Sequence, residues 1–408
     1  MTAVNSAVIY WFRNDLRVTD NPAFAHAHKQ ASQQASKVLA AYVHDPKHDA
    51  QTPWGFERMG AHRKAFLTER LHDLALQLKA LDCELTELHG SPKEALLDFA
   101  MKQDTHHICC EDIAAPEEEA DVDALKLAGL TVATWWHSSM LETGELPFDV
   151  ENLPAVFTAF RNKVERCGLL PREPQNPLLS NKNLPDSAAD KHLKNYFSND
   201  FALTYKQTRN QPMNWTPSEH FSTQFSPWLA CGAISTPMIY EKLKRFEAER
   251  GANDSTYWIW FELLWRDYFR FLHLQHGKDL YRKRGLGDAA LSHVSDNRQG
   301  LKRWCEGQTG EPLVDAGMRE LAATGWLSNR MRQVVASYLI YDLGGDWRAG
   351  AAWFESQLID YDVYSNQGNW LYIAGRGTDP RGGRRFNPQM QAQQHDPDGL
   401  YQKYWNTK

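Results

Sequence analysis

The chain has 408 residues, of which 42% are hydrophobic and 24% charged, a composition typical of a globular protein with two or three domains. No apolar run reaches the ~18 residues of a membrane span, no Cys/His cluster has the spacing of a zinc site, and the first residues do not resemble a signal peptide. We therefore expect a monomer in the reducing cytoplasm, without a metal. The net charge of −6 is uneven, because residues 1–150 carry −10 and residues 151–408 carry +4. A polyanionic partner would thus bind the second part.

Short apolar runs alternate with helical patterns over residues 1–140. The runs predict strands at 7–12, 38–43, 83–88, 107–110 and 131–135, and a helix at 60–81. Alternation of this kind predicts a doubly wound parallel sheet. No GxGxxG follows the first strand, so the usual dinucleotide-binding fingerprint is absent.

Residues 141–195 are rich in Pro, Asn and Asp and predict a connector with one short helix, at about 155–166. From 196 onward the patterns become helical. We predict helices at 236–250, 255–276, 313–323, 329–341 and 347–358. The predicted architecture is therefore an α/β domain (1–140), a connector (141–195) and an all-helical domain (196–408).

The helix around residues 258–270 carries the first candidate site. Glu262 and Arg266 are four residues apart, which allows them to pair, and Trp265 lies on the same side. The simpler interpretation is a core helix with a solvated ion pair. The alternative is an aromatic pocket wall with polar groups directed inward.

Polar residues also gather at the start of the helix predicted at 329–341. Ser328 or Asn329 would serve as its cap, but capping does not explain Arg330, Arg332 and Gln333 in the first turns. The helix dipole disfavours cations there. We therefore expect a negatively charged group nearby.

Two further segments could contact phosphates. Four arginines interleave with glycines over residues 376–388, shortly after Trp370 and Tyr372, a pattern that suits a DNA backbone with stacked bases. The hydroxyls at 222, 223 and 226 precede a helix and could bind phosphate. A solvated surface loop and an ordinary helix start are the alternative explanations.

In this order the segments resemble the photolyase/cryptochrome family over nearly the whole chain. The motifs are WFRNDLR at 11–17, WFELLWRD at 260–267 and TGWLSNR at 324–330. Three more are typical of its cryptochrome DASH branch: FSPWLA at 225–230, GNWLY at 368–372 and DPRGGRRFNP at 379–388.

The resemblance implies FAD in the helical domain, with Arg332 and Asp360 as an ion pair beside the flavin. The implied FAD-binding residues are Tyr205, Ser222, Thr223, Gln224, Phe225, Ser226, Trp260, Arg266, Arg332, Asp360, Asp362 and Asn366. Asn366 falls where the family places a residue facing flavin N5. An amide at that position adds no charge, which suits a reduced flavin.

The implied reaction is light-driven splitting of cyclobutane pyrimidine dimers in DNA, carried by Asn366, Glu262, Trp347 and Trp370. The implied DNA-binding residues are Glu262, Trp265, Asn329, Arg330, Gln333, Tyr372, Arg381, Arg384 and Arg385. Gln333 and Tyr372 offer less stacking surface than the residues of double-strand repair enzymes. We therefore expect a preference for single strands, in which flipping the dimer costs least.

The sequence also departs from the family. Trp370 and Trp347 match the inner two members of its tryptophan chain, but residues 290–296 contain no aromatic residue. The chain would then either stop at two members or use another residue such as Trp353 or Tyr338. A folate antenna is left open, since Glu117 lies in an acidic run that a solvated helix start also explains. Four other tryptophans, Trp228, Trp260, Trp304 and Trp326, are explained by packing in the core.

Two alternatives to a repair enzyme remain at this point. A blue-light photoreceptor could share the flavin site and lack repair activity. A plain nucleotide-binding α/β protein would leave the motifs of the second half unexplained.

Overall fold

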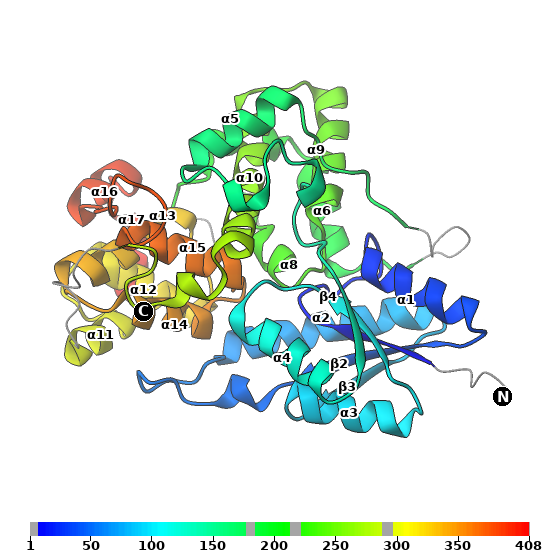
Figure 1. The fold of residues 1–408 in the computed structure, drawn as a ribbon. Coiled ribbons are helices and arrows are strands. Elements are labelled where there is room, and N and C mark those ends of the chain that lie inside the picture. Colours follow the sequence, from blue (N-terminus) through cyan, green and yellow to red (C-terminus); the bar gives the residue numbers. More distant parts are fainter. Residues whose placement is uncertain (1–6, 177–183, 213–221, 288–296, 408) are drawn as a thin grey trace.

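The computed structural model describes residues 7–176, 184–212, 222–287 and 297–407. It confirms the predicted fold class, a parallel α/β domain followed by a mostly helical domain (Figure 1). The strands are β1 (Val8–Phe12), β2 (Val38–His44), β3 (Leu85–His89), β4 (His107–Glu111) and β5 (Thr131–Trp135). The helices between them are α1 (Pro22–Gln33), η1 (Pro46–Asp49), α2 (Ala61–Ala80), α3 (Pro92–Lys102) and α4 (Pro116–Leu127).

The five strands are parallel and lie in the order β3-β2-β1-β4-β5. Successive side chains of a strand point to opposite faces, and β1 is buried on both. Val8, Tyr10 and Phe12 pack with α1 and α2, whereas Ile9 and Trp11 pack with α3 and α4. This two-sided burial explains why β1 is a continuous apolar run.

The loop after β1 joins the two domains. Asp15 is fully buried and accepts hydrogen bonds from Tyr10 Oη and, at 3.0 Å, from Asn21 Nδ2. Arg17 Nη1 donates to the carbonyl of Gly232 in the helical domain at 2.9 Å. The WFRNDLR motif therefore builds the domain junction.

The connector contains more helix than predicted. It holds η2 (Thr143–Glu145), η3 (Val150–Asn152), α5 (Phe157–Cys167) and the start of α6 (Ala188–Ser198). The expectation of a single helix was wrong because Ser187 and Asp190 form a capping box that starts α6, a signal that the surrounding Pro and Asp residues obscured. Helix α6 packs into the core of the helical domain through Leu193 and Tyr196.

The remaining helices form two adjoining hydrophobic cores, one around α9 and α10 and one around α12 to α14. Their bounds are η4 (Asp200–Leu203), α7 (Tyr205–Thr208), α8 (Ser226–Ala230), α9 (Thr236–Arg250), α10 (Asp254–His276), η5 (Gly277–Tyr281), α11 (Arg298–Cys305), α12 (Pro312–Thr324), α13 (Asn329–Ser337), η6 (Tyr338–Asp342), α14 (Trp347–Gln357), α15 (Val363–Ala374), α16 (Pro388–His395) and α17 (Leu400–Asn406). The helix predicted at 329–341 becomes π-helical after Ser337.

Helix α15 contributes to both cores and packs closely on its neighbours. A Cβ on Gly368 would lie 2.1 Å from the Phe269 ring, and one on Gly350 would lie 2.1 Å from the Trp370 ring. Only glycine permits these approaches, which bring α10, α14 and α15 together. No helix in the described ranges is long and apolar enough to cross a membrane.

Candidate functional site

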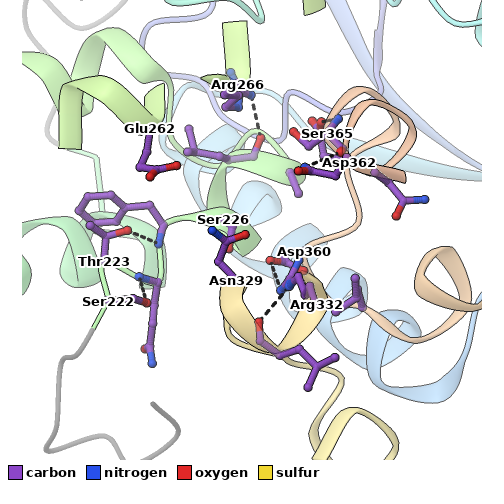
Figure 2. A pocket seen from close by; sticks show the side chains of 18 of the residues that line it. Ser222, Thr223, Ser226, Glu262, Arg266, Asn329, Arg332, Asp360, Asp362 and Ser365 are labelled. Atoms are coloured by element: carbon purple, nitrogen blue, oxygen red, sulfur yellow. Dashed lines mark hydrogen bonds and ion pairs between the residues drawn. The ribbon is translucent and has the colours of Figure 1, made fainter. Parts of the chain in front are cut away.

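A deep cavity lies between the two helical cores, and its empty volume, open mouth included, is about 1460 Å³. Helices α8 and α10 line one side, and α13, α14 and α15 line the other (Figure 2). Most of the implied site residues line it: Tyr205, Ser222, Thr223, Gln224, Phe225, Ser226, Glu262, Arg266, Asn329, Arg332, Gln333, Asp360, Asp362, Asn366 and Trp370. Segments distant in sequence thus meet at one cavity.

Arg332 and Asp360 form an ion pair at this cavity. Arg332 Nη2 lies 2.8 Å from Asp360 Oδ2, and the Asp360 side chain is only 1% exposed. Arg332 Nε also donates to the carbonyl of Leu327 at 2.9 Å, and its guanidinium lies over the Trp326 ring. Trp326 lines the cavity, so the expectation that it serves only the core was wrong.

A second charged group lies beside α10. Asp362 caps α15 by accepting from Ser365 N and pairs with Arg270 at 2.6 Å. Burial alone would raise the pKa of Asp362, but the charges of Arg270 and Arg266 outweigh it and hold that pKa well below its usual range. Asp362 is therefore a carboxylate at neutral pH.

Within the described residues, Arg266 forms no ion pair with a carboxylate. It donates to the carbonyls of Ser138 and Leu229, so the predicted pairing with Glu262 was wrong. Burial, reinforced by repulsion from Arg270, lowers the pKa of Arg266 to about 9. A buried cation in this state favours an anionic ligand.

Glu262 instead pairs with Arg209, which lies just past α7. Burial raises the pKa of Glu262, and the charge of Arg209 opposes that rise. Arg209 also lines the cavity, and the site residues chosen from the sequence did not include it. Its position four residues after Tyr205 was the available signal.

The segment before α8 presents hydroxyls and backbone N–H groups to the cavity. Gln224 N donates to Ser222 Oγ and Phe225 N donates to Thr223 Oγ1, each at 3.4 Å. Gln224 has a φ of 49°, which turns the chain sharply before Ser226. Hydroxyl donors near buried arginines suit a pyrophosphate.

Asn366 lies on α15, at the wall of the cavity. Its Nδ2 donates to the carbonyl of Ala351 at 3.0 Å, which leaves its oxygen as an acceptor. Trp370, one turn further, is 2% exposed and has its ring edge against Trp304, with centroids 6.4 Å apart. Trp347 is buried in the same hydrophobic core as Trp370, and its Nε1 donates to the carbonyl of Lys283.

Several implied residues lie elsewhere. Trp265, Tyr372 and Arg381 line a second, smaller cavity. Trp260 packs against Tyr240 and does not line the large cavity, so the structure does not support its placement against the cofactor. Arg330 lies over the Phe386 ring.

The other three implied DNA-binding arginines, which follow α15, differ in exposure. Arg381 and Arg384 both pair with Asp379, and Arg384 is the more buried of the two. Arg385 pairs with Asp342 and has a side chain that is 67% exposed.

The features that the resemblance left open are placed as follows. Residues 290–296, where the third tryptophan is missing, fall outside the described ranges. Trp353 packs edge-on against Phe56.

Glu117, in the first turn of α4, pairs with Arg58, which also pairs with Glu355 of the helical domain. In the described part of the chain, no three His, Cys, Asp or Glu side chains could hold a metal.

Known proteins resemble this chain over nearly its whole length. Residues 8–178 match a family model described as DNA photolyase, and residues 258–407 match one described as the FAD binding domain of DNA photolyase. The chain is 40% identical to the cryptochrome DASH of Gloeobacter violaceus, covering 98% of this chain and 85% of that protein. It is 39% identical to the cryptochrome DASH of Xenopus laevis, covering 99% and 83%.

Solved structures agree. A cryptochrome from Synechocystis sp. superposes with a TM-score of 0.90 at 38% identity, covering 99% of this chain and 89% of that one. A class III photolyase from Agrobacterium tumefaciens has a TM-score of 0.79 at 26% identity, covering 99% and 87%.

The fold and the cavity thus define a flavoprotein built on the photolyase scaffold. The chain belongs to the photolyase/cryptochrome family, on its cryptochrome DASH branch, and FAD is its cofactor. The residues present fit FAD, because hydroxyls and buried arginines suit its pyrophosphate and the cavity is large enough for two ring systems.

Proposed function

We propose that this protein repairs cyclobutane pyrimidine dimers in DNA with blue light and favours single-stranded substrates. The observation that carries the proposal is that Glu262, Asn329 and Gln333 line the same cavity as Arg332 and Asn366. A dimer flipped out of the strand could therefore lie directly against the cofactor. When bound, reduced FAD supplies one electron under light and takes it back after the ring has opened.

The chain's own residues would hold the dimer in place. Glu262 and Gln333 offer an acceptor and an amide to the polar edges of the two pyrimidines, and Asn329 adds a second amide. The pairing of Glu262 with Arg209 keeps its carboxyl group in one orientation. Asn366 would accept a hydrogen bond at flavin N5 through its free oxygen.

The proposal extends to the electron supply of the cofactor. Trp370 lines the cavity, and Trp347 is buried in the same hydrophobic core as Trp370. We propose that both serve as relays when the flavin is reduced by light. Trp353 and Tyr338 are the candidates for an outer member, if the chain has one.

Strand preference follows from the small stacking surface at the lesion. Gln333 is not aromatic, and the Trp265 ring is stacked on Phe157, with centroids 3.8 Å apart. Little aromatic surface is left to offset the cost of flipping a paired dimer. The exposed Arg385 and Arg381 would contact the phosphates.

The setting in the cell is part of the same proposal. All six cysteines are free, which fits the reducing cytoplasm, and we propose that the protein acts there as a monomer.

The test is illumination of the purified holoprotein with an oligo(dT) that carries one dimer. We expect loss of the dimer in the single strand, slower loss in a duplex at matched salt, and strongly reduced repair by Glu262→Gln. Glu241→Gln, on the exposed side of α9, is the matched control. Normal flavin absorption with no loss of dimer would instead favour a blue-light photoreceptor. Equal rates on both substrates would contradict the strand preference.

A further inference from the structure

The start of helix α2 lies against the helical domain, beside the large cavity. Gly60 N, at the cap of α2, donates to the carbonyl of Ser356 at 2.7 Å. His62 Nε2, in the first turn, contacts the carbonyl of Ala322 at 2.9 Å. The α/β domain thus reaches the last turns of both α12 and α14.

These two helix ends lead into the ion pair of the large cavity. Helix α13, which follows α12, carries Arg332, and the segment after α14 carries Asp360. Ile359 N donates to the carbonyl of Gly325 at 3.0 Å and joins the two segments. The start of α2 therefore contacts both helices from which the chain enters the ion pair.

Arg63, in the first turn of α2, contacts a residue of the cavity wall. Its guanidinium carbon lies 4.4 Å from the centroid of the Tyr361 ring. Tyr361 lines the cavity and stands between Asp360 and Asp362 in the sequence. Arg63 Nη1 also donates to the carbonyl of Glu355 at 3.0 Å. A cation over an aromatic ring is attracted to it, and the attraction is stronger where water is excluded.

The position of Arg63 is not explained by the stability of α2. Arg58 nearby pairs with Glu117 and Glu355, whereas Arg63 forms no ion pair with a carboxylate in the ranges that the structure describes. Burial lowers the pKa of Arg63, and the charge of Glu355 opposes that fall only in part. The helix dipole also disfavours a cation in the first turn. The contacts with Tyr361 and the Glu355 carbonyl therefore account for the position of this side chain.

We propose that Arg63 is a positioning residue for FAD, because its contact with Tyr361 holds the segment that carries Asp360 and Asp362 at the cavity. Asp362 also caps α15, so the same contact orients the helix that carries Asn366. The affinity of the helical domain for its cofactor then depends on a side chain of the α/β domain. The inference rests on FAD as the cofactor and not on DNA repair, so a dimer that stays unrepaired would leave it standing.

The variant Arg63→Gln tests the proposal, because its amide can still donate to the Glu355 carbonyl but carries no charge over the Tyr361 ring. Lys64→Gln is the matched control, since Lys64 follows on α2 and pairs with Asp49 and Glu57 of the α/β domain. The holoprotein is diluted in the dark, and the release of FAD is followed by its fluorescence. We expect the Kd for FAD to rise about tenfold in Arg63→Gln and to stay unchanged in Lys64→Gln.

Two further variants show whether Arg63 acts through Tyr361. Arg63→Lys keeps a cation over the ring and should restore most of the affinity. Tyr361→Leu removes the ring, and adding Arg63→Gln to it should cause little further loss, because the contact is already absent. Additive losses in the double variant would overturn the proposal.

Thermal unfolding of each holoprotein separates positioning from a structural role. The proposal expects the Kd for FAD to change in Arg63→Gln and to recover in Arg63→Lys. A lower unfolding midpoint in Arg63→Gln with an unchanged Kd would overturn it. Failure of Arg63→Gln to fold would likewise assign Arg63 to the domain contact alone.

Discussion

Two buried groups of charged side chains in this protein are built differently. At the domain junction, both oxygens of Asp15 and of Asp20 have donors. Asp15 accepts from Tyr10, Asn21 and the backbone of Arg13. Asp20 accepts from groups in the connector and the helical domain, namely Arg172, Gln175 N and Ser235.

The charged group around the large cavity is incomplete by comparison. Four arginines (Arg209, Arg266, Arg270 and Arg332) meet three carboxylates there (Glu262, Asp360 and Asp362), and Arg270 reaches Asp362 from outside the cavity lining. Asp360 Oδ1 and Arg270 Nε have no hydrogen-bond partner in the described chain. We conclude that a buried charged side chain with a full set of partners has a structural role. Excess charge at a cavity instead indicates a binding site for a ligand.

The largest effect is expected at the junction. Asp15→Ala removes the acceptor for three buried donors, and we expect the free energy of unfolding to fall by about 3–5 kcal/mol. Chemical denaturation measures this change. Asp98→Ala is the control, since Asp98 is 57% exposed and pairs only with Lys102, and it should cost less than about 1 kcal/mol. Similar losses in both variants would mean that the junction is not a structural network.

The next effect concerns the cavity. Arg332→Ala leaves Asp360 buried without its cation and removes a positive charge beside the cofactor. We expect FAD affinity to fall by about 3 kcal/mol, or about 100-fold, measured as the flavin content of the purified protein and by titration with FAD. Arg348→Ala, whose guanidinium pairs with Asp346 at the start of α14, should keep its flavin. Full flavin content in Arg332→Ala would contradict the distinction between the charged side chains at the domain junction and those around the large cavity.

Sequence patterns predicted much of the fold. All five strands and the long helices α9, α10, α12 and α14 lie within one or two residues of their predicted bounds, because their apolar periodicity is strong. Helix α15 was not predicted, since Ser365, Asn366, Gln367 and Asn369 give it a weak pattern. Its cap Asp362 and the close packing at Gly368 hold it as a helix.

The site was predictable as a set of residues but not as a set of contacts. Most of the residues that the resemblance implied line one cavity in the structure. Helix spacing suggested that Glu262 pairs with Arg266. Glu262 instead pairs with Arg209, which lies just past α7 and is distant in sequence, so spacing within one helix could not predict the pair. Nor could spacing show that Trp265 and Tyr372 line a different cavity from Glu262, because Trp265 stacks on Phe157, a residue distant in sequence.

Glu320 is a third case, a buried carboxyl group that forms no ion pair with any residue in the described ranges. It is 0% exposed and accepts a hydrogen bond from Tyr401. Burial raises its pKa to about 8, against that hydrogen bond and the charge of Arg332. The folded state therefore keeps a proton that the unfolded state releases near pH 4.5, the ordinary pKa of a glutamic acid side chain.

We expect this proton to make stability fall as pH rises from about 5 to 8, by up to about 1.4 kcal/mol per pH unit. Below the unfolded pKa the contribution is complete. Glu320→Gln should flatten the profile, whereas Glu306→Gln, at an exposed position just after α11, should keep it. Denaturation midpoints at several pH values measure the slopes, and an unchanged slope in Glu320→Gln would show that Glu320 is ionised when folded.

The smallest effect is expected on DNA affinity at the surface. There Arg384 has several partners within the protein and Arg385 has few, the same difference that separates the two buried groups. Arg384 is 22% exposed, donates to Tyr372 Oη at 2.9 Å and pairs with Asp379, so its donors are largely used within the protein. Arg385 is 67% exposed with a single partner, Asp342. We therefore expect Arg385 to contact a phosphate.

Arg385→Ala should reduce the slope of log affinity against log salt by about 0.7 on single-stranded DNA, the loss of one phosphate contact. Arg245→Ala, at an exposed position on α9, is the control and should leave the slope unchanged. Arg384→Ala should act mainly by freeing Tyr372 and Asp379, which lowers affinity at every salt concentration with little change in slope. Equal slopes for wild type and Arg385→Ala would mean that an exposed, singly paired arginine is not enough to mark a phosphate contact here.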